Sequence, residues 1–295
     1  MTTDLLQQFS AALAERTAAV RGAIAAVRIS PSRHITATLW RSDAAIASEQ
    51  SLPNRDEFEL VVDGGAVVKA KLAGRDPGTN IALLRLVQPV DLPAISSSEP
   101  RPGALALAVG ADGAGFVRAR LGVINAAGPE WTSLAGGRID RYIALDLELS
   151  RSEEGGLALD ARGARLGFTT LGPRGRALVI PSATVERIVP LLLNGGRVQR
   201  GWLGVGLQPV AVPDALHGEA GQQSGAMVMS IAPDSPAAKA GIVAGDIVLT
   251  VNGARGLRRI LGQLASESIG RSANLRVIRG GAVVSLKATI EPRPA

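Results

Sequence analysis

The chain has 295 residues, of which 46% are hydrophobic and 20% charged, and its formal net charge is +6. A chain of this length has room for two compact domains with buried cores, and its hydrophobic content excludes a wholly disordered protein. Cysteine is absent, which excludes disulfides, thiolate metal sites and cysteine nucleophiles. Because the arginines are spread singly and not clustered, we expect no nucleic-acid partner. No motif indicates a metal or a cofactor, and we expect neither.

Residues 1–18 carry the spacing of an amphipathic helix. Leu5, Phe9 and Leu13 recur at helical intervals, so we expect them to pack against an apolar surface. Polar residues interrupt the apolar run that a secretory signal requires, and no run reaches the roughly 18 residues of a membrane span. The chain as given therefore predicts a cytoplasmic protein without a membrane span, or a periplasmic one if a leader has been omitted.

The region from residue 19 to residue 194 reads as one β-rich domain closed by a helix. Short apolar stretches are separated by Gly, Pro and Asp turns, which is typical of a sandwich or barrel, and FELVVDGGAVVKAKL predicts a hairpin around residues 63–65. After Pro181 the apolar spacing becomes helical, with Pro190 expected to shorten or kink the helix, and the pattern stops at Asn194. Residues 195–200 are predicted to be a linker, and residues 201–295 a small α/β module.

The β-rich region of residues 19–194 and the module of residues 201–295 each resemble a domain of one known family. SPAAKAGIVAGDIVLTVNG (residues 235–253) and WLGV (residues 202–205) are similar to the PDZ domain of HtrA/Deg-type serine proteases. VVDGGAVVKAKLAGRDPGTNIALLRL, SEEGGLALDARGARLGF and IPSATVERIVPLLLNGG are similar to the trypsin-like protease domain of the same family. The resemblance implies a mainly β chain, in which a trypsin-like double six-stranded β-barrel precedes a small α/β PDZ domain.

The PDZ-like module predicts a peptide-binding groove. Successive N–H groups in a Gly-containing loop can hold a terminal carboxylate, while a strand edge and a helix accept the extended peptide beside it. The side chains of the helix can also be plain core, so the two helix members are guesses. The predicted groove residues are Trp202, Leu203, Gly204, Val205, Leu261 and Leu264.

The resemblance places Gln50, Asn80 and Glu154 where the family has its catalytic histidine, aspartate and serine. Glutamine does not titrate near neutral pH, asparagine carries no charge, and a carboxylate is a poor acyl acceptor. The two histidines, His34 and His217, lie in segments that do not match the family's base. We therefore expect a degenerate triad, no catalytic residues and no enzyme activity.

Glu154 also suggests a structural role. The loop before the family's nucleophile directs backbone N–H groups at an oxyanion, so a carboxylate at Glu154 is expected to accept the N–H groups of residues 152–154. Hydrogen bonds to the charged form lower a pKa, which we predict for this side chain. The alternative is a relaxed loop, with Ser152 in place of a glycine and Glu154 turned to solvent.

Three functions follow as expectations. The first is a catalytically inactive HtrA-like homologue that binds C-terminal peptides or unfolded polypeptides through its PDZ domain, as a regulator. The second is an active HtrA-family serine endopeptidase in protein quality control, with a triad of other residues. The third is a non-catalytic subunit of a mixed oligomer with an active paralogue. The family resemblance implies a homo-oligomer, most simply a trimer.

Overall fold

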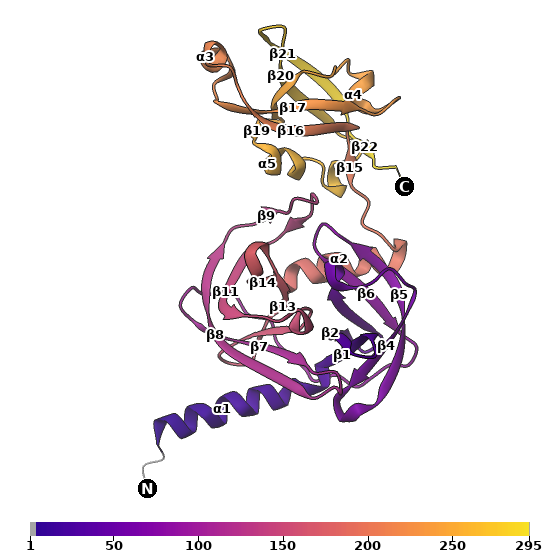
Figure 1. Cartoon of the computed structure of the whole chain (residues 1–295), viewed down its shortest axis with the longest axis vertical. Coiled ribbons are helices and arrows are strands. Elements are labelled where there is room, and N and C mark those ends of the chain that lie inside the picture. Colours follow the sequence, from indigo (N-terminus) through magenta and orange to yellow (C-terminus); the bar gives the residue numbers. More distant parts are fainter. Residues whose placement is uncertain (1–3, 295) are drawn as a thin grey trace. The chain divides into compact units, whose positions relative to one another are not determined.

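The computed structural model describes residues 4–294, which form two compact units (Figure 1). The first unit comprises the described residues up to 131 together with residues 139–198, and the second comprises residues 132–138 and 199–294. Two predicted segments reach slightly beyond this range: residues 1–3 of the N-terminal helix and residue 295 of the C-terminal module lie outside the described residues. The helix itself, α1 (Leu5–Ala19), begins after Asp4, whose side chain accepts the N–H of Leu6 at 3.2 Å.

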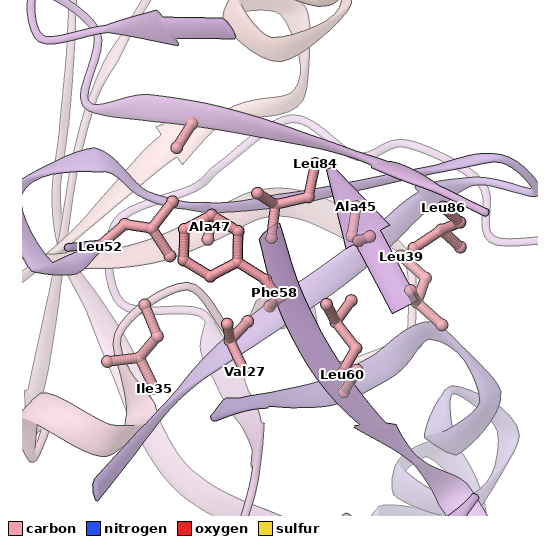
Figure 2. Packing of buried hydrophobic residues seen from close by; sticks show 14 residues of the cluster. Val27, Ile35, Leu39, Ala45, Ala47, Leu52, Phe58, Leu60, Leu84 and Leu86 are labelled. Carbon is pink, nitrogen blue, oxygen red and sulfur yellow. The ribbon is translucent and has the colours of Figure 1, made fainter. Parts of the chain in front are cut away.

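The first six strands close into a barrel in the order β1-β2-β3-β6-β5-β4. They are β1 (Ile24–Ser30), β2 (Arg33–Arg41), β3 (Ala44–Ser48), β4 (Glu57–Val62), β5 (Val67–Asp76) and β6 (Ile81–Leu86). Their inward side chains form one apolar core around Phe58, which is 3% exposed (Figure 2). The predicted hairpin is present, with residues 63–65 forming the turn between β4 and β5.

A second closed barrel follows, in the order β11-β14-β13-β12-β7-β8. Its strands are β7 (Leu105–Ala111), β8 (Val117–Gly128), β11 (Tyr142–Glu148), β12 (Leu157–Asp160), β13 (Arg165–Leu171) and β14 (Arg176–Pro181). The short strands β9 (Trp131–Thr132) and β10 (Arg138–Ile139) pair beside it. The predicted double six-stranded barrel is thereby confirmed.

Helix α2 (Ser182–Gly195) packs its apolar face where the two barrels meet. Val185, Ile188 and Val189 are buried there against side chains of both barrels, among them Ile46 and Phe168. The helix continues past Pro190, which was expected to shorten or kink it, and its last residue is Gly195, with Gly196 as the C-cap. Gly196 has a φ of +67°, a left-handed conformation that glycine adopts without strain. The helix therefore joins the barrels into one body.

The second unit is a sheet with short helices. Its main strands are ordered β16-β17-β18-β20-β21, so β16 and β21 are the edges. The elements are β15 (Gly201–Trp202), β16 (Val205–Ala211), α3 (His217–Ala220), β17 (Ser224–Ile231), α4 (Pro236–Lys239), β18 (Ile247–Val251), β19 (Ala254–Arg255), α5 (Leu257–Gly262), β20 (Ser272–Arg279), β21 (Ala282–Thr289) and β22 (Glu291–Pro292). Across both units, the described residues contain no helix that is long and apolar enough to cross a membrane.

Candidate functional site

Gln50 and Asn80 meet at one end of the first barrel because of the register of two strands. Strand β3 pairs with β6 so that Ser48 lies opposite Ile81, and the residues beyond these ends, Gln50 and Asn80, come together. Asn80 has a φ of +58°, which asparagine tolerates better than most side chains. Its Oδ1 accepts the backbone N–H of Gln50 at 2.8 Å. Two of the three predicted positions are therefore hydrogen-bonded to each other.

Glu154 reaches the same place from the second barrel. It lies between a short 3-10 turn (Arg151–Glu153) and β12, and its carbonyl accepts the N–H of Thr36 on β2 at 3.1 Å. The next carbonyl, that of Gly155, accepts the Thr38 hydroxyl at 2.9 Å. These bonds between barrels fix the loop, so the structure brings together all three residues that the sequence analysis singled out.

The Glu154 carboxylate is the centre of a buried polar cluster. The side chain is 1% exposed, and its Oε1 accepts the Ser48 hydroxyl at 2.8 Å, the Thr170 hydroxyl at 2.9 Å and the Leu171 N–H at 3.1 Å. The Gln50 amide also donates to Oε1, and the Ser51 hydroxyl donates to Oε2. We call this set the Glu154 cluster: Ser48, Gln50, Ser51, Asn80, Glu154, Thr170 and Leu171. Five donors thus compensate one buried charge.

These donors determine the ionisation of the carboxylate. Burial alone would raise the pKa of Glu154, but the hydrogen bonds from Ser51, Gln50, Leu171 and Ser48 outweigh it, and the pKa is lowered. The predicted direction of this shift is confirmed. A carboxylate with a lowered pKa is a weak base, and the cluster holds serine hydroxyls but no titratable nitrogen.

The donors are not the ones that the sequence analysis expected. The carboxylate of Glu154 was predicted to accept the backbone N–H groups of residues 152–154, and its described partners are all elsewhere. The N–H of Glu153 instead donates to the Ser150 carbonyl at 3.0 Å. Because that loop is closed by its own turn, the prediction of an occupied oxyanion site is wrong. The alternative, a relaxed loop with Glu154 turned to solvent, is also wrong in one respect, because the Glu154 side chain is buried.

Glu153 is a structural residue that the sequence analysis missed. Its carboxylate is bonded to the Arg120 guanidinium at 2.6 Å and to the N–H and hydroxyl of Ser150, both at 2.8 Å. Burial raises the pKa of Glu153, and these bonds lower it further than burial raises it. The Ser150-x-x-Glu153 spacing is that of a capping box and was the available signal.

The two histidines lie away from the Glu154 cluster. His34 is on β2 and lines a surface groove of the first barrel. His217 begins α3 in the second unit, and its Nε2 is 2.8 Å from the Val212 carbonyl. Neither has a described contact with the cluster.

In the second unit, the six predicted groove residues line one pocket of about 220 Å³. Gly204 has a φ of +80°, and a Cβ there would lie 2.2 Å from Cβ of Ser235, so only glycine fits. The carbonyls of Leu203 and Gly204 accept N–H groups of the same unit, at 2.9 and 2.8 Å. Their own N–H groups donate to no described residue, which leaves two donors at the end of the edge strand β16.

Comparison with known proteins agrees with this architecture. Residues 15–167 match the family described as "Trypsin-like peptidase domain", and residues 201–290 match "PDZ domain". The chain belongs to the HtrA-type trypsin-like peptidases. The first match covers more than half of the chain, and together the two matches confirm the resemblance read from the sequence.

Several curated relatives carry functional names. The chain is 31% identical over 261 residues to a "Probable periplasmic serine endoprotease DegP-like" of Brucella suis, covering 84% of this chain and 50% of that protein. It is 28% identical over 246 residues to the "Periplasmic pH-dependent serine endoprotease DegQ" of Escherichia coli, covering 80% of this chain and 54% of that protein. The chain thus spans about half the length of these relatives.

Solved structures show the same fold. One described as "HtrA-type protease AlgW with tripeptide" has a TM-score of 0.74 at 25% identity, covering 96% of this chain and 97% of that one. Another, "HtrA-type protease AlgW with decapeptide", has a TM-score of 0.75 at 23% identity, covering 96% and 99%. The likeness therefore extends over both units of the chain.

Two expectations need correction in the light of these relatives. The prediction that the chain is not an enzyme is wrong, because the relatives are named serine endoproteases and the fold is that of an HtrA protease. That prediction rested on the residue types at the three triad positions and on the placement of the two histidines. The expected cytoplasmic location also lacks support, since the relatives are named periplasmic.

Proposed function

We propose that this chain is an HtrA-family protein that acts on polypeptides and captures their carboxyl-terminal ends in its PDZ domain. The observation that carries the proposal is that the backbone N–H groups of Leu203 and Gly204, at the end of the edge strand β16, donate to no described acceptor. A terminal carboxylate accepts such donors, and the preceding residues of a ligand can add to the strand edge. Leu261 and Leu264 line the same pocket and supply apolar contact for the last side chain.

A peptide-binding measurement tests this proposal. A fluorescent peptide with a free carboxyl end and an apolar last residue is expected to bind the full chain with micromolar affinity, about −8 kcal/mol. The same peptide with an amidated end should bind at least tenfold more weakly, because the two N–H groups then face a neutral amide. Equal affinity for the two peptides would exclude a carboxylate site at these residues.

A matched pair of variants locates the ligand. Leu261→Glu places a like charge beside the bound carboxylate and should abolish binding, while Arg271→Glu changes an exposed residue of the same unit and should leave binding intact. The thermal unfolding of both variants is measured alongside, so that loss of binding is separated from loss of structure. Similar weakening in both variants would show that net charge, and not the groove, governs the affinity.

A second candidate function is endoproteolysis, which is favoured by the printed names of the curated relatives. In the Glu154 cluster the available hydroxyls are those of Ser48 and Ser51, each donating to Glu154. Hydrolysis here has to proceed without a histidine. Release of acid-soluble peptides from casein by the full chain, and its loss in Ser51→Ala or Ser48→Ala, would establish this function and its nucleophile. A preparation of Glu154→Gln made in parallel controls for contaminating protease.

Location and assembly complete the proposal. The periplasmic names of the relatives support a periplasmic site of action.

On α1, Leu5 is 79% and Leu6 73% exposed, a helix surface that a trimer or a mixed oligomer with a paralogue would cover. Light scattering on the full chain and on a chain starting at Ala19 tests assembly, and a monomer in both cases contradicts it. Co-purification from the native cell distinguishes a homo-oligomer from a mixed one.

A further inference from the structure

A broad groove lies on the first barrel, separate from both the Glu154 cluster and the PDZ pocket. Its volume is about 930 Å³, which is in the range of ligand-binding clefts. It forms because β1 pairs with β4 only from Ala25 to Val27, and the end of β1 then leaves β4. Residues 57–59 of β4 consequently pair with β5 alone. We call this cleft the β1–β4 groove.

The charges in the β1–β4 groove are mostly positive. Two of its cations are paired within it: Arg28 lies 3.1 Å from Glu59, and Lys71 lies 3.7 Å from Glu57. The remaining cations have no carboxylate partner among the described residues. These are Arg33, Arg55 and Lys69.

Arg55 is held in place rather than left mobile. Its guanidinium donates to the carbonyls of Arg28 and Ile29 and stacks over the Phe58 ring, 4.7 Å from the ring centroid. The position of this charge is therefore fixed against the wall of the groove. Because a fixed cation loses little conformational entropy when it binds an anion, Arg55 is prepared for a carboxylate.

We propose that the β1–β4 groove binds an extended acidic segment of a polypeptide. In an extended chain alternate side chains lie roughly 7 Å apart on one face, so one segment can direct several carboxylates toward the cations Arg33, Arg55 and Lys69 of the lining. The side chains between them contact the apolar part of the lining, which includes Ile29 and Val87. Glu57 and Glu59 stand in the same groove and disfavour a continuous run of phosphates, which argues against nucleic acid and an anionic lipid surface.

The test uses the full chain and a fluorescent decapeptide with glutamate at alternate positions, leucine or alanine between them, and an amidated carboxyl end. Amidation removes the terminal carboxylate, so failure of this experiment and failure of the PDZ proposal are distinguishable. Binding is expected to weaken at least tenfold when the glutamates are replaced by glutamine, and to weaken with added salt. Equal binding of the glutamine peptide overturns the proposal.

Variants assign the binding to this groove. Arg33→Glu combined with Lys69→Glu should weaken binding at least tenfold, whereas Arg271→Glu combined with Lys287→Glu, an equal change of net charge at exposed positions, should change it less than twofold. Equal loss in both double variants overturns the assignment. Displacement of the acidic peptide by single-stranded DNA or by anionic lipid vesicles at the same concentration of charge also overturns the assignment. Unfolding temperatures of all variants confirm that each is folded.

Discussion

Replacing Glu154 by leucine tests whether the Glu154 cluster stabilises the first unit. Leucine fills a similar volume but accepts no hydrogen bond, so the donors of the cluster lose their acceptor. Gln50 and Ser48 have other partners, at the Leu171 carbonyl and at Asn80. The Ser51 and Thr170 hydroxyls and the Leu171 N–H have no other described acceptor.

The expected magnitude follows from these three orphaned donors. A buried donor without an acceptor costs about 1–3 kcal/mol, so Glu154→Leu should lower the free energy of unfolding by about 6 kcal/mol. For a domain of this size that corresponds to a decrease in Tm of roughly 12–24 °C. Glu154→Gln keeps an acceptor for the donors at Oε1 and should cost only about 1–2 kcal/mol.

Urea and thermal unfolding measure the effect, with tryptophan fluorescence as the signal. Trp40 and Trp131 lie in the first unit, so a Trp202→Phe background restricts the signal to that unit. Glu57→Leu, at a carboxylate whose side chain is 77% exposed, is the matched control and should change stability by less than about 0.5 kcal/mol. A Glu154→Leu protein as stable as wild type would refute the reasoning.

The same pair of proteins gives a pH signature with a defined sign. The pKa of Glu154 is lowered on folding, so its contribution to stability is fully present above the ordinary glutamate pKa of about 4.3 and is lost as the pH falls through the lowered value. The difference in stability between wild type and Glu154→Gln should therefore be constant from pH 6 to 8 and shrink below about pH 4.

Two further predictions concern other residues. Gly155→Ala should prevent stable folding or lower Tm severely, because at a φ of +93° its Cβ would lie 2.1 Å from the Thr36 carbonyl oxygen. Soluble yield and Tm measure this effect, and a Tm near that of wild type contradicts the prediction. Arg279→Ala removes the guanidinium that is bonded to both oxygens of Asp246 at 2.8 and 2.7 Å, and should lower the Tm of the PDZ domain. Burial raises the pKa of Asp246, but hydrogen bonds from Arg279 and the backbone lower it overall. The decrease in Tm caused by Arg279→Ala should therefore be largest near pH 7 and should shrink below about pH 4. A decrease in Tm that is independent of pH would rule out the ion pair as its cause.

The sequence predicted the elements better than the contacts between them. The β4–β5 hairpin and helix α2 were found from local patterns, because turn residues and helical spacing are properties of neighbouring residues. The hydrogen-bond donors around Glu154 were not predicted. Thr170 and Leu171 lie on β13, and the pairing of β13 with β12, the strand that follows Glu154, brings them to its carboxylate.

The site residues show the same division. Gln50 and Asn80 were placed correctly beside Glu154 because the family resemblance fixes the order of the segments that carry them. The inference from these side chains to a chain without enzyme activity went too far, because residue identity at three positions does not describe the whole domain. Glu153 was overlooked because the Ser150-x-x-Glu153 capping-box spacing was not considered; its exposed fraction is 7%.

The closure of both barrels has a consequence for solubility. In the described part of the first unit, both barrels are closed, so no barrel strand has a wholly free side from which a foreign strand could extend the sheet, although residues 57–59 of β4 pair with β5 alone. Open edges are sites at which strand-forming segments of other chains can add and co-aggregate. The main sheet of the second unit is open along β16 and β21, so the full-length strand edges that other segments could join lie in that unit.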